Sequence, residues 1–296
     1  MPLHALDPAT LRKLDALTLH TNRSLRGFRI GNHRSASRGQ GIEFADYRNY
    51  IAGDNPRNID WGVYGRTEKL YVRTYTEEQN LSVLIYLDSS NSMRCTTNSD
   101  KWDWATNVFA ALGYIGIRDR ERVLISSGIF NAPVSVGNLP ELRSVTERLI
   151  NAPKYSTNLS LLPEVELQTL SNTLSKLKTP GIGIILSDFL MPLADIQQIV
   201  LRFVSHNFDI TAVQIISDQD LAPFGNANYG TALDSETGEE LIVSVEPNQY
   251  LKHLNQHYDQ VSLLLQKNGA RFIRSTAKKD LFEFLSRNIR KSGILR

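Results

Sequence analysis

Four short apolar runs, separated by segments of helical length, constrain the fold of this chain more than any other feature of its sequence. The runs are rich in β-branched residues and cover residues 81–87, 122–130, 181–187 and 209–217. Such runs are typical of strands that are buried on both faces of a parallel sheet. Helices are predicted between or beside them at residues 102–117, 139–150, 161–177 and 196–204. This alternation predicts an α/β fold with a doubly wound, mostly parallel, Rossmann-like sheet that binds ligands at the carboxyl ends of its strands.

The composition shifts near residue 80, which we interpret as the boundary between two parts of the chain. Residues 81–296 are predicted to form the α/β domain, which is completed by a hairpin tip at 232–241, a helix at 247–267, a strand at 271–275 and a helix at 279–290. Residues 1–80 are predicted to form an N-terminal helix, followed by an irregular arginine- and glycine-rich β extension. Pro8 opens that helix, and its leucines at 11, 14 and 17 share one face.

The charge and cysteine content exclude several classes of protein. Basic and acidic side chains number 33 and 31, and this near balance argues against a nucleic-acid coat protein. The single cysteine, Cys95, cannot form an internal disulfide, which fits a reducing compartment. No apolar run reaches the roughly 18 residues that span a bilayer, and the first residues do not resemble a signal peptide. We therefore expect a cytoplasmic protein that does not insert into membranes.

Oxygen-bearing side chains follow two of the predicted strands. Asp88, Ser90 and Ser92 are spaced i, i+2, i+4 directly after the first strand, and Asp188 follows the third. Thr157 lies in a predicted loop between helices. Together they form a set of hard oxygen ligands, which suits Mg²⁺ or Mn²⁺ and does not suit zinc or copper. An aspartate followed by serines also commonly caps a helix or turn, so the motif alone leaves both interpretations open.

These five residues, in this chain order, resemble the metal-ion-dependent adhesion site of von Willebrand factor A domains, and the resemblance covers about residues 80–290. It implies that the two serines and the threonine approach the cation, while the aspartates act largely through water. Asp218 follows the next strand and is a rival for the distal carboxylate. We prefer Asp188, because the family has this residue on the strand after the threonine loop.

The segment before the α/β domain carries a second resemblance, to the bacterial family of domains of unknown function 58 (DUF58). The matching residues are Gly39-Gln40-Gly41-Ile42-Glu43-Phe44, Asp46-Tyr47-Arg48, Tyr50, Gly53-Asp54, Arg57, Ile59-Asp60-Trp61, Arg66 and Glu77-Glu78. Members of this family are commonly encoded beside MoxR-type AAA+ ATPases, and some carry amino-terminal membrane helices. The resemblance implies a MoxR-type ATPase as a partner.

Arginines and carboxylates alternate along this segment. Bidentate pairs between them can stabilise the fold of a segment that has few apolar residues. We therefore interpret these residues as a structural ion-pair network. The alternative is a docking face. Six further basic residues have fewer nearby acids and could meet an acidic partner or a phosphate backbone, namely Arg23, Arg26, Arg29, His33, Arg34 and Arg38.

Sequence motifs of common hydrolases are absent from the chain: it has no G-x-S-x-G, H-E-x-x-H or Walker A sequence. His253 and His257 are four residues apart on a predicted helix, but without a third ligand we expect a solvated face. We therefore predict a Mg²⁺-dependent protein-interaction module or adaptor rather than an enzyme. The alternatives are a metal-dependent hydrolase of phosphorylated substrates and a nucleic-acid-binding protein that uses the N-terminal arginines.

Overall fold

The computed structural model describes residues 4–20, 42–77, 82–94, 101–130, 132–152, 162–177, 181–222, 229–233, 240–244, 247–277 and 279–296. The chain divides into two compact units, each described here by itself. The small unit is Ser24–Asn80, and the large unit combines Met1–Arg23 with Leu81–Arg296. Within the described ranges, no helix is both long and apolar enough to cross a membrane.

The N-terminal helix belongs to the large unit, which corrects the predicted grouping of residues 1–80. Its elements are a 3-10 turn, η1 (His4–Leu6), and helix α1 (Pro8–Leu14). Leu14 and Leu17 are buried in the core of the large unit. The backbone of Thr18 pairs with that of Arg296 near the other end of the chain. The apolar face of α1 therefore removes its leucines from water against the α/β domain.

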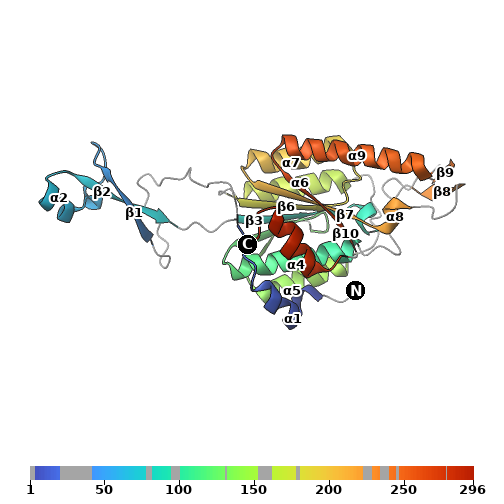
Figure 1. Ribbon diagram of the computed structural model, residues 1–296, viewed down its shortest axis with the longest axis horizontal. Helices are drawn as coiled ribbons and strands as arrows, with labels where there is room; N and C mark the ends of the chain where they lie inside the picture. The colour runs from blue at the N-terminus through green and yellow to red at the C-terminus, as the bar shows by residue number, and fades with distance from the viewer. Residues whose placement is uncertain are drawn as a thin grey trace. The chain divides into compact units, whose positions relative to one another are not determined.

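A six-stranded sheet forms the centre of the large unit (Figure 1), in the order β10-β7-β6-β3-β4-β5. The strands are β3 (Ser82–Leu87), β4 (Arg122–Ser126), β5 (Val134–Val136), β6 (Gly181–Ser187), β7 (Asp209–Ile216) and β10 (Arg271–Thr276). Only β5 is antiparallel to its neighbour. The predicted mostly parallel α/β sheet is thus confirmed. The run predicted as one strand at 122–130 ends as a strand at Ser126.

Helices cover both faces of this sheet (Figure 1). One face carries α1, α4 (Lys101–Arg118) and α5 (Leu139–Ile150). The other carries α6 (Leu162–Ser175), α7 (Leu193–Ser205) and α9 (Pro247–Lys267). The sheet is therefore doubly wound, and its central strands β3, β6 and β7 are buried on both sides.

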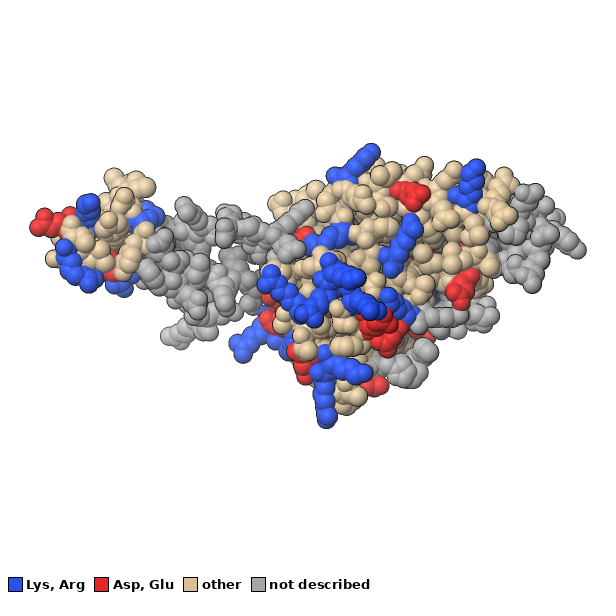
Figure 2. All heavy atoms as spheres, in the orientation of Figure 1, with Lys and Arg blue, Asp and Glu red and all other residues tan. Residues whose placement is uncertain are grey.

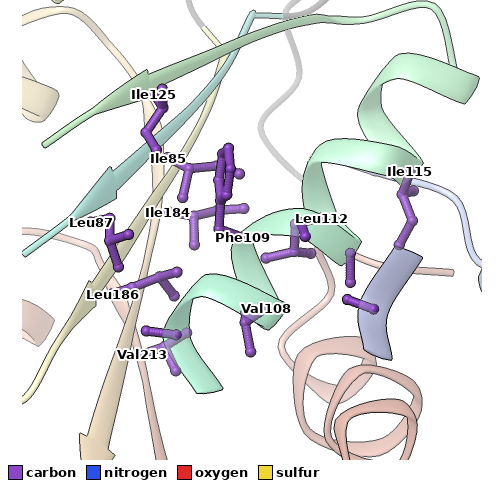
Figure 3. Close-up of a cluster of buried hydrophobic side chains, with 14 of the residues drawn as sticks. Ile85, Leu87, Val108, Phe109, Leu112, Ile115, Ile125, Ile184, Leu186 and Val213 are labelled. Atoms are coloured by element: carbon purple, nitrogen blue, oxygen red, sulfur yellow. The ribbon is translucent and has the colours of Figure 1, made fainter. Parts of the chain in front are cut away.

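Helix α4 fills the centre of one apolar layer. Figure 3 shows its side chains Val108, Phe109 and Leu112 against strand residues such as Ile85 and Ile184, all of them buried. Gly116 lets the helix approach the sheet, because a Cβ atom there would lie 2.6 Å from Val123 Cγ2. This packing fixes the start of α4, whose first residue is Lys101, close to the carboxyl ends of the strands.

Shorter elements complete the large unit. They are α3 (Asn91–Arg94), α8 (Asp218–Leu221), the antiparallel pair β8 (Tyr229–Leu233) and β9 (Glu240–Ser244), α10 (Leu281–Glu283) and a π-helix, η4 (Phe284–Ile289). The single helix predicted at 279–290 is thus a helical turn followed by a π-helix. The edge strand β5 was not predicted, because three residues are too few to show the alternation of apolar and polar side chains that marks a strand.

The small unit is built on a two-stranded antiparallel hairpin. Its elements are β1 (Ile42–Asn49), η2 (Pro56–Asn58), α2 (Trp61–Thr67) and β2 (Tyr71–Glu77). Within residues 42–77 the predicted β extension contains two strands, and helix α2 is an addition. Asp60 caps α2, because its Oδ1 accepts from the backbone N–H groups of Gly62 and Val63 at 2.9 and 3.1 Å. The cap starts a helix in a glycine-containing sequence that shows no helical pattern.

Two of the predicted ion pairs are present in the small unit. Arg48 forms a bidentate pair with Asp54, at 2.6 Å for both contacts. Arg73 pairs with Asp60 at 2.7 Å, and Tyr47 donates to the same carboxylate at 2.9 Å. The six basic residues from 23 to 38 lie outside the described residues, as do the side chains of Glu43, Asp46, Glu77 and Glu78.

Candidate metal centre at the switch point of the sheet

The sheet changes winding direction between β3 and β6. From β3 the chain proceeds to β4 on one side, and from β6 it proceeds to β7 on the other. Ligands of doubly wound sheets bind at such a switch point, outside the carboxyl ends of the strands. Asp88 and Asp188 directly follow these two strands, and the register pairs Leu87 with Leu186. The structure therefore brings the two aspartates to the same edge of the sheet.

The loop after β3 presents two hydroxyl groups side by side. The backbone N–H of Ser90 donates to Asp88 Oδ1 at 2.9 Å, which closes a tight turn. Ser90 Oγ and Ser92 Oγ then share a hydrogen bond of 3.0 Å, and both serines are half-buried. Asp88 itself is fully buried, and its Oδ2 accepts a hydrogen bond of 2.5 Å from Ser187. The loop thus brings two half-buried hydroxyls together and holds a buried carboxylate beside them.

The spacing of these oxygens fits an octahedral cation. Two ligands that are about 2.1 Å from Mg²⁺ and at right angles to each other lie about 3.0 Å apart. The two serine hydroxyls have this separation. In the described part of the chain, no three His, Cys, Asp or Glu side chains gather as a metal site, so any cation here would depend on hydroxyl ligands. The donor set favours Mg²⁺ or Mn²⁺ over zinc.

Asp188 is held by a buried lysine that was not predicted. Lys101 Nζ, at the start of α4, lies 2.9 Å from Asp188 Oδ2 and 2.8 Å from Asp220 Oδ1. Burial disfavours the ammonium charge, but the two carboxylates outweigh burial and raise the pKa of Lys101. The other oxygen of Asp188 accepts from the backbone N–H of Leu190 at 3.1 Å. Asp188 is therefore fixed in position beside the loop of Asp88.

Asp218, the alternative to Asp188 as the distal carboxylate, is not among the buried carboxylates of the site. It is exposed in the first turn of α8, whereas Asp220 in the same short helix is buried against Lys101. Asp220 also forms a capping box with Ser217, whose N–H donates to Asp220 Oδ2 at 2.7 Å. The buried carboxylate that follows β7 is therefore Asp220, two residues after Asp218.

Glu166 is a second functional candidate that was not predicted. Although it comes from α6, it reaches the loop after β3, where its Oε1 accepts from the backbone N–H of Ser89 at 2.8 Å and also from the Ser89 hydroxyl. Its Oε2 accepts a bond of 2.5 Å from Tyr86. Burial raises the pKa of Glu166, and these hydrogen bonds oppose that shift. Gly128 leaves room for the contact, since a Cβ atom there would lie 2.8 Å from Glu166 Cγ.

The buried ionisable groups at this edge would carry an excess of negative charge if all were ionised. Burial raises the pKa of Asp88 well above its ordinary value, and the carboxylates of Glu166 and Asp188 raise it further. The described residues gather four carboxylates and two cationic groups here, namely Asp88, Glu166, Asp188 and Asp220 with Arg94 and Lys101. When all are ionised there are two more negative charges than positive ones. A divalent cation would neutralise this excess, which is the electrostatic argument for a metal.

Two other predictions concern Thr157 and the histidines of α9. Thr157 lies outside the described residues, so its position stays a prediction. His253 is exposed, and His257 Nε2 lies 2.7 Å from the carbonyl oxygen of Phe189, next to Asp188. Phe189 has a left-handed backbone with φ of 55°, which is uncommon for a bulky side chain. The contact from His257 therefore helps to hold the turn after β6.

Comparisons with known proteins agree with the second resemblance. A family model described as "Protein of unknown function DUF58" matches residues 46–260. Uncharacterized proteins from Mycobacterium tuberculosis and Mycobacterium bovis are 24% identical to the chain over 286 residues. The match covers 93% of this chain and 87% of each relative.

Solved structures with some similarity have low sequence identity. One is the conserved hypothetical protein BatB from Bacteroides thetaiotaomicron, with 12% identity, a TM-score of 0.40 and coverage of 72% of this chain and 99% of the other. Another is the VWA domain of Rpn10, with 10% identity, a TM-score of 0.35 and coverage of 70% and 94%.

Proposed function

We propose that this chain, which belongs to the family of proteins of unknown function DUF58, is a protein-interaction module that binds its partner through Mg²⁺. Asp88, Ser90 and Ser92 would hold the cation, together with Asp188 and, by resemblance, Thr157. Bound Mg²⁺ would supply an electrophilic centre that a carboxylate of the partner can bind. Mn²⁺ would be held by the same oxygens.

The pair of serine hydroxyls is the observation that carries this proposal. Ser90 Oγ and Ser92 Oγ lie 3.0 Å apart and are half-buried, above the fully buried Asp88. Neutral hydroxyls orient a cation without neutralising it, so its attraction for an outside carboxylate is preserved. The buried carboxylates below supply the long-range attraction that retains the ion.

A partner with an exposed acidic side chain fits this arrangement. The family resemblance points to a MoxR-type AAA+ ATPase as that partner, with a role in assembling or remodelling other proteins. The geometry supports only the acidic chemistry, and the identity of the partner rests on the resemblance. The chain would then act as an adaptor whose contact depends on the metal.

The second candidate function is hydrolysis of phosphorylated substrates with a metal-activated water. Two buried carboxylates with raised pKa values, Asp88 and Glu166, favour it, because such groups often act in acid–base catalysis. Three observations oppose it. Glu166 is held by three hydrogen bonds, and Asp188 and Asp220 are both engaged by Lys101. A base with free access to a substrate is absent from the described residues of the site.

The first test measures binding of the purified MoxR-type ATPase encoded in the same genome to the full chain, with Mg²⁺ and with EDTA. We expect binding that EDTA abolishes and that Asp88→Ala abolishes in a folded protein. His253→Ala is the control, because His253 is exposed on α9. Binding that persists both in EDTA and in Asp88→Ala would refute the metal-bridged contact.

A second test separates the module from a hydrolase. Phosphoester and nucleotide substrates are incubated with the chain and Mg²⁺ or Mn²⁺, and release of phosphate is followed. We expect no turnover above that of Ser90→Ala. Turnover that disappears in Ser90→Ala would favour the hydrolase.

A further inference from the structure

The small unit exposes aromatic side chains on a helix that buries nothing. None of the residues of α2 is buried, and Trp61 and Tyr64 are 61% and 41% exposed. They are three residues apart and therefore lie on one face of the helix. Their rings meet edge to face, with centroids 6.0 Å apart. Large exposed aromatic groups of this kind are unusual on a surface that has no partner.

Contacts outside the helix hold α2 in place. A seven-residue helix is too short to be stable alone. The Asp60 carboxylate accepts from two backbone N–H groups of α2, from Tyr47 and from Arg73. The Asp60 N–H also donates to the carbonyl oxygen of Tyr71 in β2, at 2.9 Å. The hairpin thus fixes the start of α2, although α2 buries none of its own side chains. These hydrogen bonds therefore hold the aromatic face of the helix in an exposed position.

Basic side chains surround this face. Arg57, Arg66 and Lys69 are exposed, and the structure pairs none of them with a carboxylate in the described part of the unit. Three carboxylate side chains are described in this unit. Asp54 and Asp60 are largely buried, with side chains 13% and 6% exposed, and Glu68 at the end of α2 is exposed. Figure 2 shows mainly basic and uncharged side chains on the visible described surface of this unit. The described exposed side chains of α2 and its flanks are therefore aromatic and, with three basic groups against one carboxylate, positively charged on balance.

We propose that α2, through Trp61, Tyr64 and Arg66, docks an acidic segment of a partner protein that also carries apolar side chains. Tryptophan, tyrosine and arginine are the residues that most often dominate binding energy in protein interfaces. The surrounding positive charge would steer an acidic segment and exclude a basic one. This docking surface lies on the small unit and does not use the switch-point site, so it needs no metal.

A nucleic acid is the other macromolecule that aromatic and basic residues could bind. Stacking of successive bases needs ring faces that are presented in parallel. The rings of Trp61 and Tyr64 are inclined at 84° to each other, so they do not form such a platform. The aliphatic side chain of Ile51, 67% exposed in the same unit, also suits a protein partner better than bases.

The test uses fluorescence polarisation of labelled probes with the full chain in EDTA. The positive probe is a random copolymer of glutamate and tyrosine. Polyglutamate lacks the apolar groups, a lysine–tyrosine copolymer reverses the charge, and a short single-stranded DNA represents nucleic acids. We expect the glutamate–tyrosine copolymer to bind best and to lose about 30-fold in affinity in Trp61→Ala. Arg66→Glu should weaken binding by at least about tenfold.

Two controls match these variants in the large unit: Leu263→Ala, which truncates an apolar residue that is 56% exposed, and Lys252→Glu, which reverses an exposed charge. Both should bind like the parent. Circular dichroism should show that Trp61→Ala is folded, and Tyr64→Ala, a second exposed substitution on the same face, should also weaken binding.

Four outcomes would overturn the proposal. Tighter binding of the DNA would assign the face to nucleic acid. Self-association that Trp61→Ala abolishes, with no binding of the copolymer, would assign it to a second copy of the chain. Equal binding by the parent and Trp61→Ala would place the contact elsewhere. A lack of binding by any probe, together with cross-links from residue 61 to the large unit, would mean that the chain covers this face itself.

Discussion

Lys101 Nζ lies 2.9 Å from Asp188 Oδ2, and neither side chain has appreciable contact with solvent. This ammonium group is a permanent counter-ion of the carboxylate that a metal at the switch point would use. It orients Asp188, and it also reduces the negative charge that attracts a cation. Lys101 should therefore weaken metal binding while it stabilises the metal-free protein.

The first prediction concerns Lys101→Met, which keeps most of the side-chain volume and removes the charge. The substitution leaves Asp188 and Asp220 buried without their partner, so the metal-free protein should lose about 3–5 kcal/mol of stability. Mg²⁺ should then raise the melting temperature more than it does in the parent. Calorimetry with Mg²⁺ and with EDTA measures both effects. Lys176→Met, at an exposed lysine just after α6, should respond to Mg²⁺ like the parent, and the same response in Lys101→Met would contradict the counter-ion role.

The second prediction concerns the proposed metal ligands. Because burial and the neighbouring carboxylates raise the pKa of Asp88, its ionised form destabilises the metal-free fold. Asp88→Asn should therefore be more stable than the parent in EDTA at neutral pH. Mg²⁺ at a hundredfold excess over Kd should stabilise the parent by about 2.7 kcal/mol, and Asp88→Asn and Ser92→Ala should lose most of this gain. A Mg²⁺-induced rise in melting temperature that survives in both variants would mean that the ion binds elsewhere.

The third prediction concerns Gly128. A Cβ atom at this position would lie 2.7 Å from Ser89 Oγ and 2.8 Å from Glu166 Cγ. Gly128→Ala should therefore cost about 1–3 kcal/mol, because the site must shift to admit the methyl group. Gly65→Ala is the matched control: a Cβ atom there meets nothing within 4 Å, and alanine should stabilise the exposed helix α2 by about 0.5–1 kcal/mol. Calorimetry of both variants should give shifts of opposite sign.

The fourth prediction concerns acid. The hydrogen bond from Tyr47, together with the Arg73 guanidinium, lowers the pKa of Asp60 to about 2. A carboxylate whose pKa is lower in the folded state stabilises the fold above its unfolded pKa, and this contribution disappears as the pH falls from about 4 to about 2. The environment of Trp61 should therefore change over this interval. Fluorotryptophan NMR can follow Trp61 separately from Trp102 and Trp104.

Asp60→Asn is the control for the acid experiment. The amide has no titrating charge, so this variant should start with a weakened helix cap and show little further change at the Trp61 signal between about pH 4 and pH 2. A parent-like transition in Asp60→Asn would mean that another group controls the small unit in acid.

The strands and long helices could be predicted because their signal is local. Residues 139–150 and 247–267 form helices with the predicted bounds, since amphipathic spacing over several turns is hard to produce by chance. Strands β3, β6 and β7 are likewise marked by continuous apolar runs. Helix α2 and strand β5 were missed, because the first depends on one aspartate cap and the second has only three residues.

The site could be predicted only in part, for a related reason. Asp88, Ser90 and Ser92 are close in the sequence, and the order of the strands brings Asp188 beside them. Lys101, Glu166 and Asp220 look like ordinary charged residues of helices. Their roles depend on partners 77 to 119 residues away along the chain, and a single sequence carries no local sign of such contacts.

The long separation between Lys101 and Asp220 has a consequence for synthesis. The ribosome makes the loop of Asp88 early, but Glu166 and Ser187, which hydrogen-bond to this loop, come later in the chain, and Asp220, which holds Lys101 beside Asp188, comes later still. A nascent chain that ends before α8 has the hydroxyls of the proposed site without the ion triad that fixes its distal carboxylate. The geometry of the proposed site is thus complete only when most of the large unit has left the ribosome.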